Sequence, residues 1–536
     1  MSWIQSTTIY QIYPRSFYDS NDDGIGDIQG IIQKLDYIKD LGFETIWISP
    51  FYTSPQQDFG YDIADYFSID KDYGTVQDVE QLIEAAHQRK LKIVLDMVIN
   101  HTSNQHPWFL ESKQNTTNDK ADWYIWRDKP NNWKSIIGTK AWHFVEERNQ
   151  YYYTSFLPFQ PDLNYQNETV KQTMFNVCKF WLDKGADGFR LDIFNCIIKD
   201  KHFRNNPFSL LHGIPTIDQP GGNFQNRKYS VNQPENFELA KDLRAIINQY
   251  QPDRLLLGEV FGEHHVKKQY LGNGNDGLHI IFLFDIIHFK FKASFFKERI
   301  KAYEKNYPFP YQPVVNFSNH DQWRSQFRLK NNINKAKLLT LLQMTMRAVP
   351  VSYYGEEIGM TNAYIPIKQA KDKLAHAFTW IPEWIAKRMP VPINRDNCRT
   401  PMQWNSNKNA GFSNANTTWL SVVDDYKQRN VVQAQADKDS LYYTYKTLLN
   451  LRKTNNSINK GKLNLIEDTP NAIIMYERIY ETEKHIIILC FSNKKISIPL
   501  ADDKYTILLK LNDSFTWENN TLELSNYNGL IFREIV

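Results

Sequence analysis

The sequence predicts an α/β fold, a (β/α)8 TIM barrel with an inserted small domain after strand 3 and a C-terminal antiparallel β-sandwich. Short apolar runs alternate with stretches of helical spacing along most of the chain, which is typical of a parallel barrel. The alternation stops near residue 101, resumes near 168 and gives way to short β-type runs after about 460. A chain of 536 residues also exceeds one ordinary core, so several domains are expected.

The barrel elements follow from local patterns. Strands are short β-branched, aromatic and apolar runs, and helices repeat apolar residues at three- and four-residue intervals. The expected barrel strands are 8–13, 45–49, 93–98, 188–192, 254–259, 277–284, 313–319 and 349–355. The expected helices are 28–41, 76–89, 170–184, 237–250 and 335–348.

Three other segments lack the alternating pattern. Residues 101–167 are rich in Trp, Tyr, Asn and Pro and are too long for a plain loop, which predicts an inserted domain. Residues 201–236 read as a long irregular loop, and 472–477, 485–492, 505–510 and 529–533 read as sandwich strands. The predicted domains are therefore 1–100 with 168–459 (barrel), 101–167 (insert) and 460–536 (sandwich).

Composition excludes several kinds of partner. The 63 basic and 60 acidic residues leave a net charge of only +3, so we expect no nucleic-acid partner. No run approaches the ~20 apolar residues of a membrane span, and the N-terminus lacks the pattern of a signal peptide. Four widely spaced cysteines favour reduced thiols. We therefore expect a cytoplasmic monomer without a membrane partner.

Polar residues gather where the barrel strands end. Asp96, Asp192 and Glu259 each close a strand, His101 lies just beyond one, and Asn319-His320-Asp321 follows another. Parallel barrels carry their chemistry at the C-terminal ends of their strands. Two carboxylates there can act as a nucleophile and an acid/base, which is the requirement of glycosidic bond cleavage.

At these residues the chain resembles the α-amylase superfamily, family 13 of the glycoside hydrolases. Its motifs are matched by Asp-Met-Val-Ile-Asn-His at 96–101, Gly-Phe-Arg-Leu-Asp at 188–192, Gly-Glu-Val at 258–260 and Asn-His-Asp at 319–321. The oligo-1,6-glucosidase and α-glucosidase branch is the most similar. That likeness rests on the motifs at 10–17, 160–164, 353–360 and 399–404.

The resemblance implies roles for the matched residues. Asp192 would be the nucleophile, with Arg190 holding its pKa down, and Glu259 would be the acid/base with a higher pKa. Asp321 would grip the ring hydroxyls of the sugar. His101 and His320 would hydrogen-bond the same ring.

The resemblance also implies a pocket closed behind one sugar. Tyr61 would stack under the terminal glucose, while Asp58 and Arg399 would capture its non-reducing-end hydroxyls. Arg395 is a second arginine nearby, ranked below Arg399 because only Arg399 directly precedes Thr-Pro-Met-Gln-Trp. Such a pocket implies exo-action on short oligosaccharides.

Linkage is expected to depend on Ile193, which directly follows the nucleophile. In similar enzymes Val here accompanies α-1,6 preference and Ala or Thr accompanies α-1,4. The expected function is therefore an exo-acting retaining α-glucosidase that slightly favours α-1,6 links. Alternatives are a transglycosylase or isomerase of the sucrose isomerase or trehalose synthase type, a trehalose-6-phosphate hydrolase and, remotely, a non-catalytic transporter-associated scaffold.

The loop after the first strand suits a hard cation. Oxygens recur at Asp19, Asn21, Asp23, the Ile25 carbonyl and Asp27, but Gly30 stands where an EF-hand needs a bidentate Glu. The resemblance implies a structural calcium site here, with a metal-free loop rich in Asx-turns as the alternative. We expect no organic cofactor.

Overall fold

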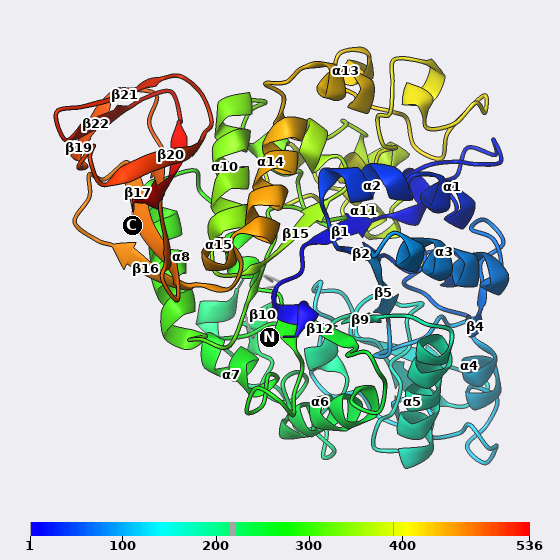
Figure 1. Cartoon of the computed structure of the whole chain (residues 1–536). Helices are drawn as coiled ribbons and strands as arrows, with labels where there is room; N and C mark the ends of the chain where they lie inside the picture. Colours follow the sequence, from blue (N-terminus) through cyan, green and yellow to red (C-terminus); the bar gives the residue numbers. More distant parts are fainter. Residues whose placement is uncertain (1, 214–220, 390, 536) are drawn as a thin grey trace.

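A computed structural model describes residues 2–213, 221–389 and 391–535 and contains an eight-stranded parallel barrel (Figure 1). The strand order is β13-β12-β9-β5-β2-β1-β15-β14, and a parallel bridge between Phe282 and Val314 brings the two edges together. The strands are β1 (Ile9–Ile12), β2 (Thr45–Ile48), β5 (Lys92–Met97), β9 (Gly188–Leu191), β12 (Leu255–Gly258), β13 (Ile280–Ile281), β14 (Val314–Val315) and β15 (Val349–Tyr353). The predicted barrel is confirmed.

The interior of the barrel is apolar toward the N-terminal ends of the strands and polar toward their C-terminal ends. Ile9, Val94 and Leu257 belong to one buried cluster with residues of β2 and β15. Side chains in a strand return to the same face every second residue. Gln11 and Asp96, two positions beyond Ile9 and Val94, are fully buried in the next layer. The polar layer therefore lies at the C-terminal mouth of the barrel.

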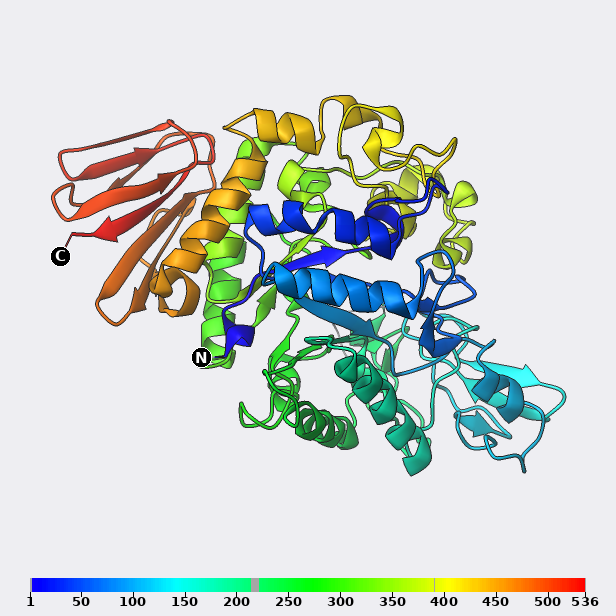
Figure 2. The same cartoon turned by 45° about the vertical axis from the view of Figure 1, so that its right-hand side comes forward.

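Helices cover the outside of the barrel (Figures 1 and 2). The main ones are α3 (Val76–Gln88), α5 (Glu168–Asp183), α6 (Pro234–Ile247), α8 (Ala293–Asn306), α10 (Ile333–Thr345) and α14 (Leu441–Thr454). The predicted helix 28–41 is two helices, α1 (Ile28–Gln33) and α2 (Leu35–Leu41), because the chain breaks at Lys34. The predicted strands 277–284 and 313–319 pair over only two residues before the chain leaves the sheet.

The segment 101–167 forms its own small layer beside the mouth, on the side away from the C-terminal sheets (Figure 2). It holds α4 (Pro107–Ser112) and a three-stranded sheet of β6 (Trp126–Arg127), β8 (Gln150–Tyr153) and β7 (Trp142–Val145). An antiparallel bridge between His101 and Asp162 joins its two ends.

The 201–236 region is less irregular than the sequence suggests. It carries a short pair, β10 (Gly221–Gly222) with β11 (Gln225–Asn226), and α6 begins at Pro234. Residues 214–220 of this predicted loop lie outside the described residues. The division into 1–100 with 168–459, 101–167 and 460–536 remains our interpretation of the domains.

Two antiparallel sheets form the C-terminal part. One is β16 (Lys462–Ile466), β17 (Ile473–Tyr480), β18 (Glu483–Cys490), β23 (Gly529–Glu534) and β20 (Tyr505–Lys510), and the other is β19 (Ile496–Pro499), β22 (Thr521–Leu524) and β21 (Phe515–Glu518). Ile488, Leu522 and Phe532 share one buried core between the sheets. The opposite face of the larger sheet packs on the barrel helices, where the Tyr476 and Thr345 hydroxyls meet at 2.5 Å.

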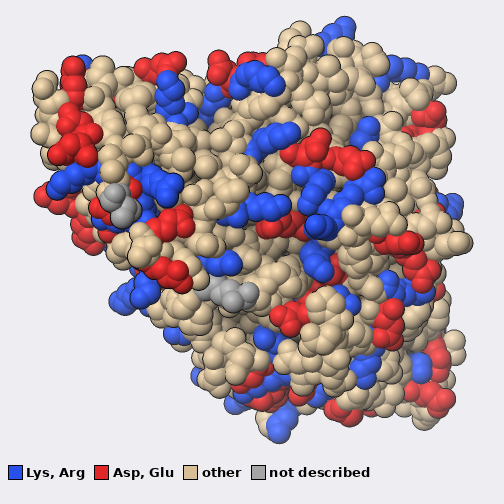
Figure 3. Space-filling view, viewed as in Figure 1, with Lys and Arg blue, Asp and Glu red and all other residues tan. Residues whose placement is uncertain are grey.

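The surface carries both signs of charge. On the face shown in Figure 3, basic and acidic side chains are interspersed. None of the helices in the described part of the chain has the length and apolar character of a bilayer span.

Candidate active site

The two expected catalytic carboxylates lie one residue beyond neighbouring strands. The Asp192 amide donates to the Met97 carbonyl at 3.2 Å, and the Glu259 amide donates to the Leu191 carbonyl at 2.9 Å. These bonds continue the parallel pairing past the strand ends, so both side chains reach the same mouth. Asp192 and Glu259 are 7% and 8% exposed.

One guanidinium joins the two carboxylates. Arg190 donates through Nη1 to Asp192 Oδ1 at 2.7 Å and to Asp96 Oδ1 at 2.8 Å, and through Nη2 to Glu259 Oε2. The Trp47 indole donates to Asp96 Oδ2 at 3.1 Å, and its ring lies 5.0 Å from the guanidinium. A single buried cation therefore faces three buried carboxylates.

This excess of carboxylates favours retention of a proton. Burial raises the pKa of Glu259 well above its ordinary value; Arg190 opposes the shift and the Asp192 carboxylate adds to it. Burial likewise raises the pKa of Asp96, again against Arg190. Glu259 can therefore hold a proton near neutral pH, as a general acid must.

A second arginine cluster surrounds Asp321. Arg399 Nη2 donates to Asp321 Oδ1 at 2.8 Å, and Arg395 Nη1 donates to the same oxygen at 3.2 Å. Burial alone would raise the pKa of Asp321, but His320, Arg395 and Arg399 hold it well below the ordinary value. Asp321 is therefore a fixed negative charge that can accept hydrogen bonds from sugar hydroxyls.

Asp58 pairs with Arg395 and not with Arg399, and the capture of sugar hydroxyls by Asp58 and Arg399 stays a prediction. Asp58 Oδ1 accepts from Arg395 Nη2 at 2.6 Å, and Asp58 Oδ2 accepts from Gln160 at 3.0 Å. The fully buried Arg399 instead donates to Asp321 and, through Nε, to the His320 carbonyl at 2.8 Å. Both arginines contact Asp321, but their positions in the sequence motif could not tell which of them reaches Asp58.

Tyr61 and His320 form a stacked pair next to Asp321. Their rings are 5.3 Å apart and 2° from parallel, and the Tyr61 hydroxyl lies 2.7 Å from His320 Nε2. Burial lowers the pKa of His320 to about 3, so the imidazole is neutral at ordinary pH. Gln11 Nε2 lies 2.8 Å from Nδ1, which leaves the proton on Nε2 when Gln11 is the donor.

His101 is bound from both sides by the protein. Its Nε2 lies 3.1 Å from the Tyr61 carbonyl and its Nδ1 lies 3.1 Å from Asn100 Nδ2. Because both ring nitrogens have protein partners, the observed contacts place His101 behind Tyr61. Its direct contact with a sugar stays a prediction.

Lys199 is a buried residue that the sequence analysis missed. Its ammonium donates to Asn100 Oδ1 at 3.0 Å, to the Ile197 carbonyl at 3.2 Å and to Asp162 Oδ2. This contact fastens the inserted segment to the barrel beneath His101. The only signal in the sequence was the position of Asp162 within the 160–164 motif.

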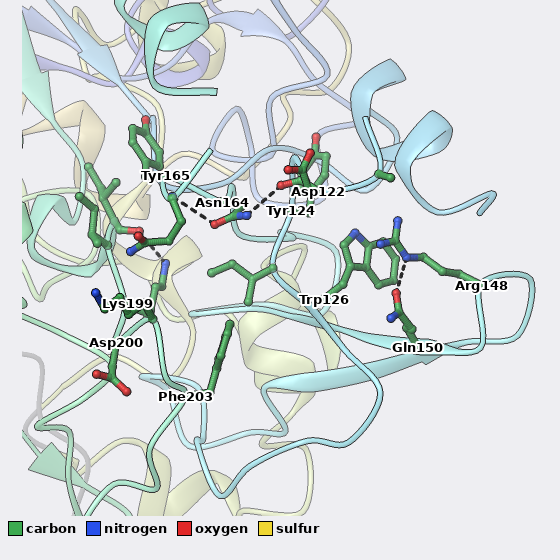
Figure 4. Close-up of a pocket in the computed structure, with 16 residues that line it drawn as sticks. Asp122, Tyr124, Trp126, Arg148, Gln150, Asn164, Tyr165, Lys199, Asp200 and Phe203 are labelled. Atoms are coloured by element: carbon green, nitrogen blue, oxygen red, sulfur yellow. Dashed lines mark hydrogen bonds between the residues drawn. The ribbon is translucent and has the colours of Figure 1, made fainter. Parts of the chain in front are cut away.

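A cavity of about 390 Å³ lies on the outer side of Lys199 (Figure 4). Trp126, Arg148 and Gln150 from the inserted segment face Lys199, Asp200 and Phe203 across it (Figure 4). Neither Asp192 nor Glu259 lines this cavity, so it is separate from these two carboxylates.

Comparison with known proteins places this geometry in a family. The model of the α-amylase catalytic domain matches residues 11–461. The chain belongs to the α-amylase family. An oligo-1,6-glucosidase of Bacillus cereus is 35% identical and aligns with 99% of this chain and 99% of its own.

Solved structures of the family agree over the whole chain. An α-glucosyl transfer enzyme superposes with a TM-score of 0.90 at 32% identity, and a trehalose-6-phosphate hydrolase of Bacillus licheniformis with 0.89 at 32%. Each comparison covers 100% of both chains. The protein is therefore a glycoside hydrolase of the α-amylase family.

Ile193 has an unusual backbone in this family member. Its φ of 36° and ψ of 44° are left-handed, and a β-branched residue adopts that conformation only under strain. Its amide lies 3.3 Å from Glu259 Oε2, and its side chain is 5% exposed. Ile193 thus contributes to the environment of the Glu259 carboxyl through its backbone.

The expected calcium loop uses its oxygens internally. Asp19 accepts from the amides of Asn21, Asp22 and Gly24, and Asp23 accepts from the Ile25 amide. Asp27 caps α1 through the Gly30 amide at 2.6 Å. Among the described residues no group of three or more His, Cys, Asp or Glu could hold a metal ion. The donor set resembles the Asx-turn alternative, and calcium stays a prediction.

Proposed function

We propose that this glycoside hydrolase is an exo-acting retaining α-glucosidase that releases terminal α-linked glucose from short oligosaccharides. The observation that carries the proposal is the Arg190 guanidinium, which contacts Asp192 and Glu259 together. Retaining enzymes hold their carboxyls about 5–5.5 Å apart, whereas inverting enzymes need about 6.5–9.5 Å for a water. Two carboxylates on adjacent nitrogens of one guanidinium suit the shorter spacing.

In the first step an Asp192 oxygen bonds to the anomeric carbon of the bound glucose. The bond from that carbon to the leaving oxygen breaks, and the leaving oxygen takes the proton of Glu259. This step yields a glucosyl ester on Asp192 and a free alcohol or shortened sugar. The raised pKa of Glu259 keeps the required proton in place beforehand.

In the second step Glu259, now a carboxylate, removes a proton from water. The oxygen of that water bonds to the anomeric carbon, and the ester bond to Asp192 breaks. Glucose leaves in the α-configuration, and both carboxyls return to their starting states. Asp321 acts throughout as a fixed hydrogen-bond acceptor for the sugar ring.

Exo-action is supported by the second cluster. Asp58, Arg395, Asp321 and Arg399 are joined by ion pairs of 2.6–3.2 Å across one side of the site. Among the residues that the structure describes, the buried Arg399 Nη1 lacks a protein partner. A cluster of this kind offers several hydrogen-bonding groups to one terminal sugar.

We propose a slight preference for α-1,6 over α-1,4 links. It is supported by the apolar Ile193 beside the acid and by relatives such as the oligo-1,6-glucosidase of Bacillus cereus. The whole-chain likeness to an α-glucosyl transfer enzyme supports transglycosylation as a second candidate, and the likeness to a trehalose-6-phosphate hydrolase supports a third.

Product analysis separates these activities. Isomaltose, maltose, sucrose, trehalose and trehalose 6-phosphate should be offered in parallel, with initial products followed by NMR. The proposal expects α-glucose as the first product and the highest kcat/KM on isomaltose. Initial β-glucose would exclude retention, and predominant isomers or longer sugars would replace hydrolysis by transfer.

We also propose a structural Ca²⁺ held by Asp19, Asn21, Asp23, the Ile25 carbonyl and Asp27. Excess Ca²⁺ should then raise the melting temperature, since a ligand that binds only the folded state stabilises it. Asp23→Ala should remove that response, and a full response in this variant would exclude the loop. The four unpaired cysteines support the proposed cytoplasmic location, and light scattering would test the proposed monomer.

A further inference from the structure

Arg395 pairs with both Asp58 and Asp321, and its own position depends on one further residue. Asp372 accepts from Arg395 Nη2 at 2.7 Å and from Arg395 Nε at 2.8 Å, the side-on fork that matches carboxylate and guanidinium geometry. It also accepts from the Arg395 backbone amide at 3.1 Å. Three donors of one residue thus converge on one carboxylate.

Asp372 is well placed to determine where Arg395 points. Its side chain is 1% exposed and that of Arg395 is 12% exposed. With the Nε edge held by Asp372, the two terminal nitrogens of Arg395 face Asp58 at 2.6 Å and Asp321 at 3.2 Å. A guanidinium is planar and rigid, so fixing one edge fixes the other.

Asp372 belongs to a segment outside the barrel strands. The described residues of the 361–394 segment, 361–389 and 391–394, follow β15 and contain α11 (Lys373–His376), α12 (Glu383–Ala386) and a small core of their own. The carboxylate reaches Arg395 from the N-cap position of α11, where it also accepts from the Leu374 amide at 3.0 Å. The segment therefore contacts Arg395 through Asp372.

Charge argues for the same assignment. Burial alone would raise the pKa of Asp372, but Arg395 holds it below its ordinary value. Asp372 is thus an ionised partner that stays with Arg395. Without Asp372, the Nε edge of Arg395 would have no carboxylate partner, and the orientation of the guanidinium toward Asp58 and Asp321 would no longer be fixed.

We propose that Asp372 is a positioning residue that sets Arg395 for recognition of the terminal glucose, which makes the 361–394 segment part of substrate selection. This inference rests on the proposed exo-glucosidase function. Asp372 touches no reacting atom, so it acts only through Arg395.

A double-mutant cycle tests this dependence, using the full chain with Asp372→Asn, Arg395→Lys and both changes together. Asp372→Asn should raise KM for p-nitrophenyl α-glucoside roughly tenfold or more, with a smaller change in kcat, since hydrogen bonds to charged groups contribute about 1.5–3 kcal/mol. The double variant should be no worse than Arg395→Lys alone, because residues that act through one another are not additive.

A matched control separates positioning from loosening of the segment. Glu383 anchors the same segment by accepting from the Ile367 amide at 2.8 Å and the Tyr364 hydroxyl at 2.7 Å, but it has no contact with Arg395. Glu383→Gln should lower the melting temperature with little change in KM. An equal rise of KM in this control would overturn the inference.

Two other results would overturn it, namely an unchanged KM in Asp372→Asn and losses that multiply in the double variant. The same cycle should be repeated with calorimetric binding of 1-deoxynojirimycin, a glucose-shaped inhibitor, because that readout needs no turnover. A wild-type protein that hydrolyses no α-glucoside would refute the proposed function, while the binding cycle would still decide the role of Asp372.

Discussion

Two arginine clusters at one barrel mouth differ in the balance of their charges. Around Arg190, one cation faces the carboxyls of Asp96, Asp192 and Glu259. Around Arg395 and Arg399, two cations face Asp58, Asp321 and Asp372. Both clusters are largely buried, so solvent screens neither of them strongly.

The balance of charge decides where a proton can be kept. In the first cluster burial outweighs the single cation, and the pKa of Glu259 rises. In the second, His320 and the two arginines outweigh burial at Asp321, the two arginines outweigh it at Asp372, and both pKa values fall. Asp58 is the exception, because burial raises its pKa despite both arginines. The first cluster suits proton transfer and the second suits fixed recognition.

The largest expected effect is at the catalytic pair. Asp192→Ala should lower kcat by at least about 10⁴-fold, since losing a nucleophile removes the covalent route. Glu259→Gln should lower kcat by roughly 10²–10⁴-fold on sugar leaving groups and far less on p-nitrophenyl α-glucoside, which needs little protonation. Equal losses on both substrates would count against Glu259 as the acid.

A carboxylate of the recognition cluster should affect binding without affecting the proton. Asp58→Asn removes the charge that Arg395 meets at 2.6 Å. We expect KM for isomaltose to rise roughly 10–100-fold, as expected for hydrogen bonds to charged groups. The alkaline limb of the pH profile of kcat/KM should stay in place. A shift of that limb would show that Asp58 also affects the pKa of Glu259, against the division of roles between the two clusters.

Asp96→Asn should affect the proton instead. With one competitor removed, Arg190 is freer to stabilise the Glu259 carboxylate, so the pKa of Glu259 should fall. Glu259 works as an acid only while protonated, so the alkaline limb of kcat/KM should move to lower pH. A profile measured on isomaltose checks this shift. His320, whose pKa is about 3, cannot produce that limb.

The smallest expected effect concerns linkage. Ile193→Thr keeps the β-branch and the left-handed backbone but replaces a methyl-bearing arm by a hydroxyl. We expect the ratio of maltose to isomaltose kcat/KM to rise by about tenfold, near the lower end of the roughly 1–3 kcal/mol that such pocket changes contribute. If the ratio of these two specificity constants does not change, linkage selection lies elsewhere, with the 201–236 loop as the next region to test.

The sequence predicted the barrel and the catalytic pair for one physical reason. Parallel strands end at a common edge, so Asp192 and Glu259 had to meet once their strands were recognised. Contacts made by long side chains from loops were not predictable. Arg395 and Arg399 both suit Asp58 by position, and Asp372 and Lys199 lie in segments whose path no local pattern defines.

The left-handed backbone at Ile193 connects the proposed choice of linkage with the thermal stability of the protein. A β-branched residue held there costs about 1–3 kcal/mol of folding free energy, which the surrounding packing must offset. Gly or Asn at this position would relieve that strain but would also remove the apolar side chain beside the acid. Replacing Ile193 by Gly or Asn should therefore raise the melting temperature as well as change the surroundings of Glu259, whereas Ile193→Thr keeps the strain.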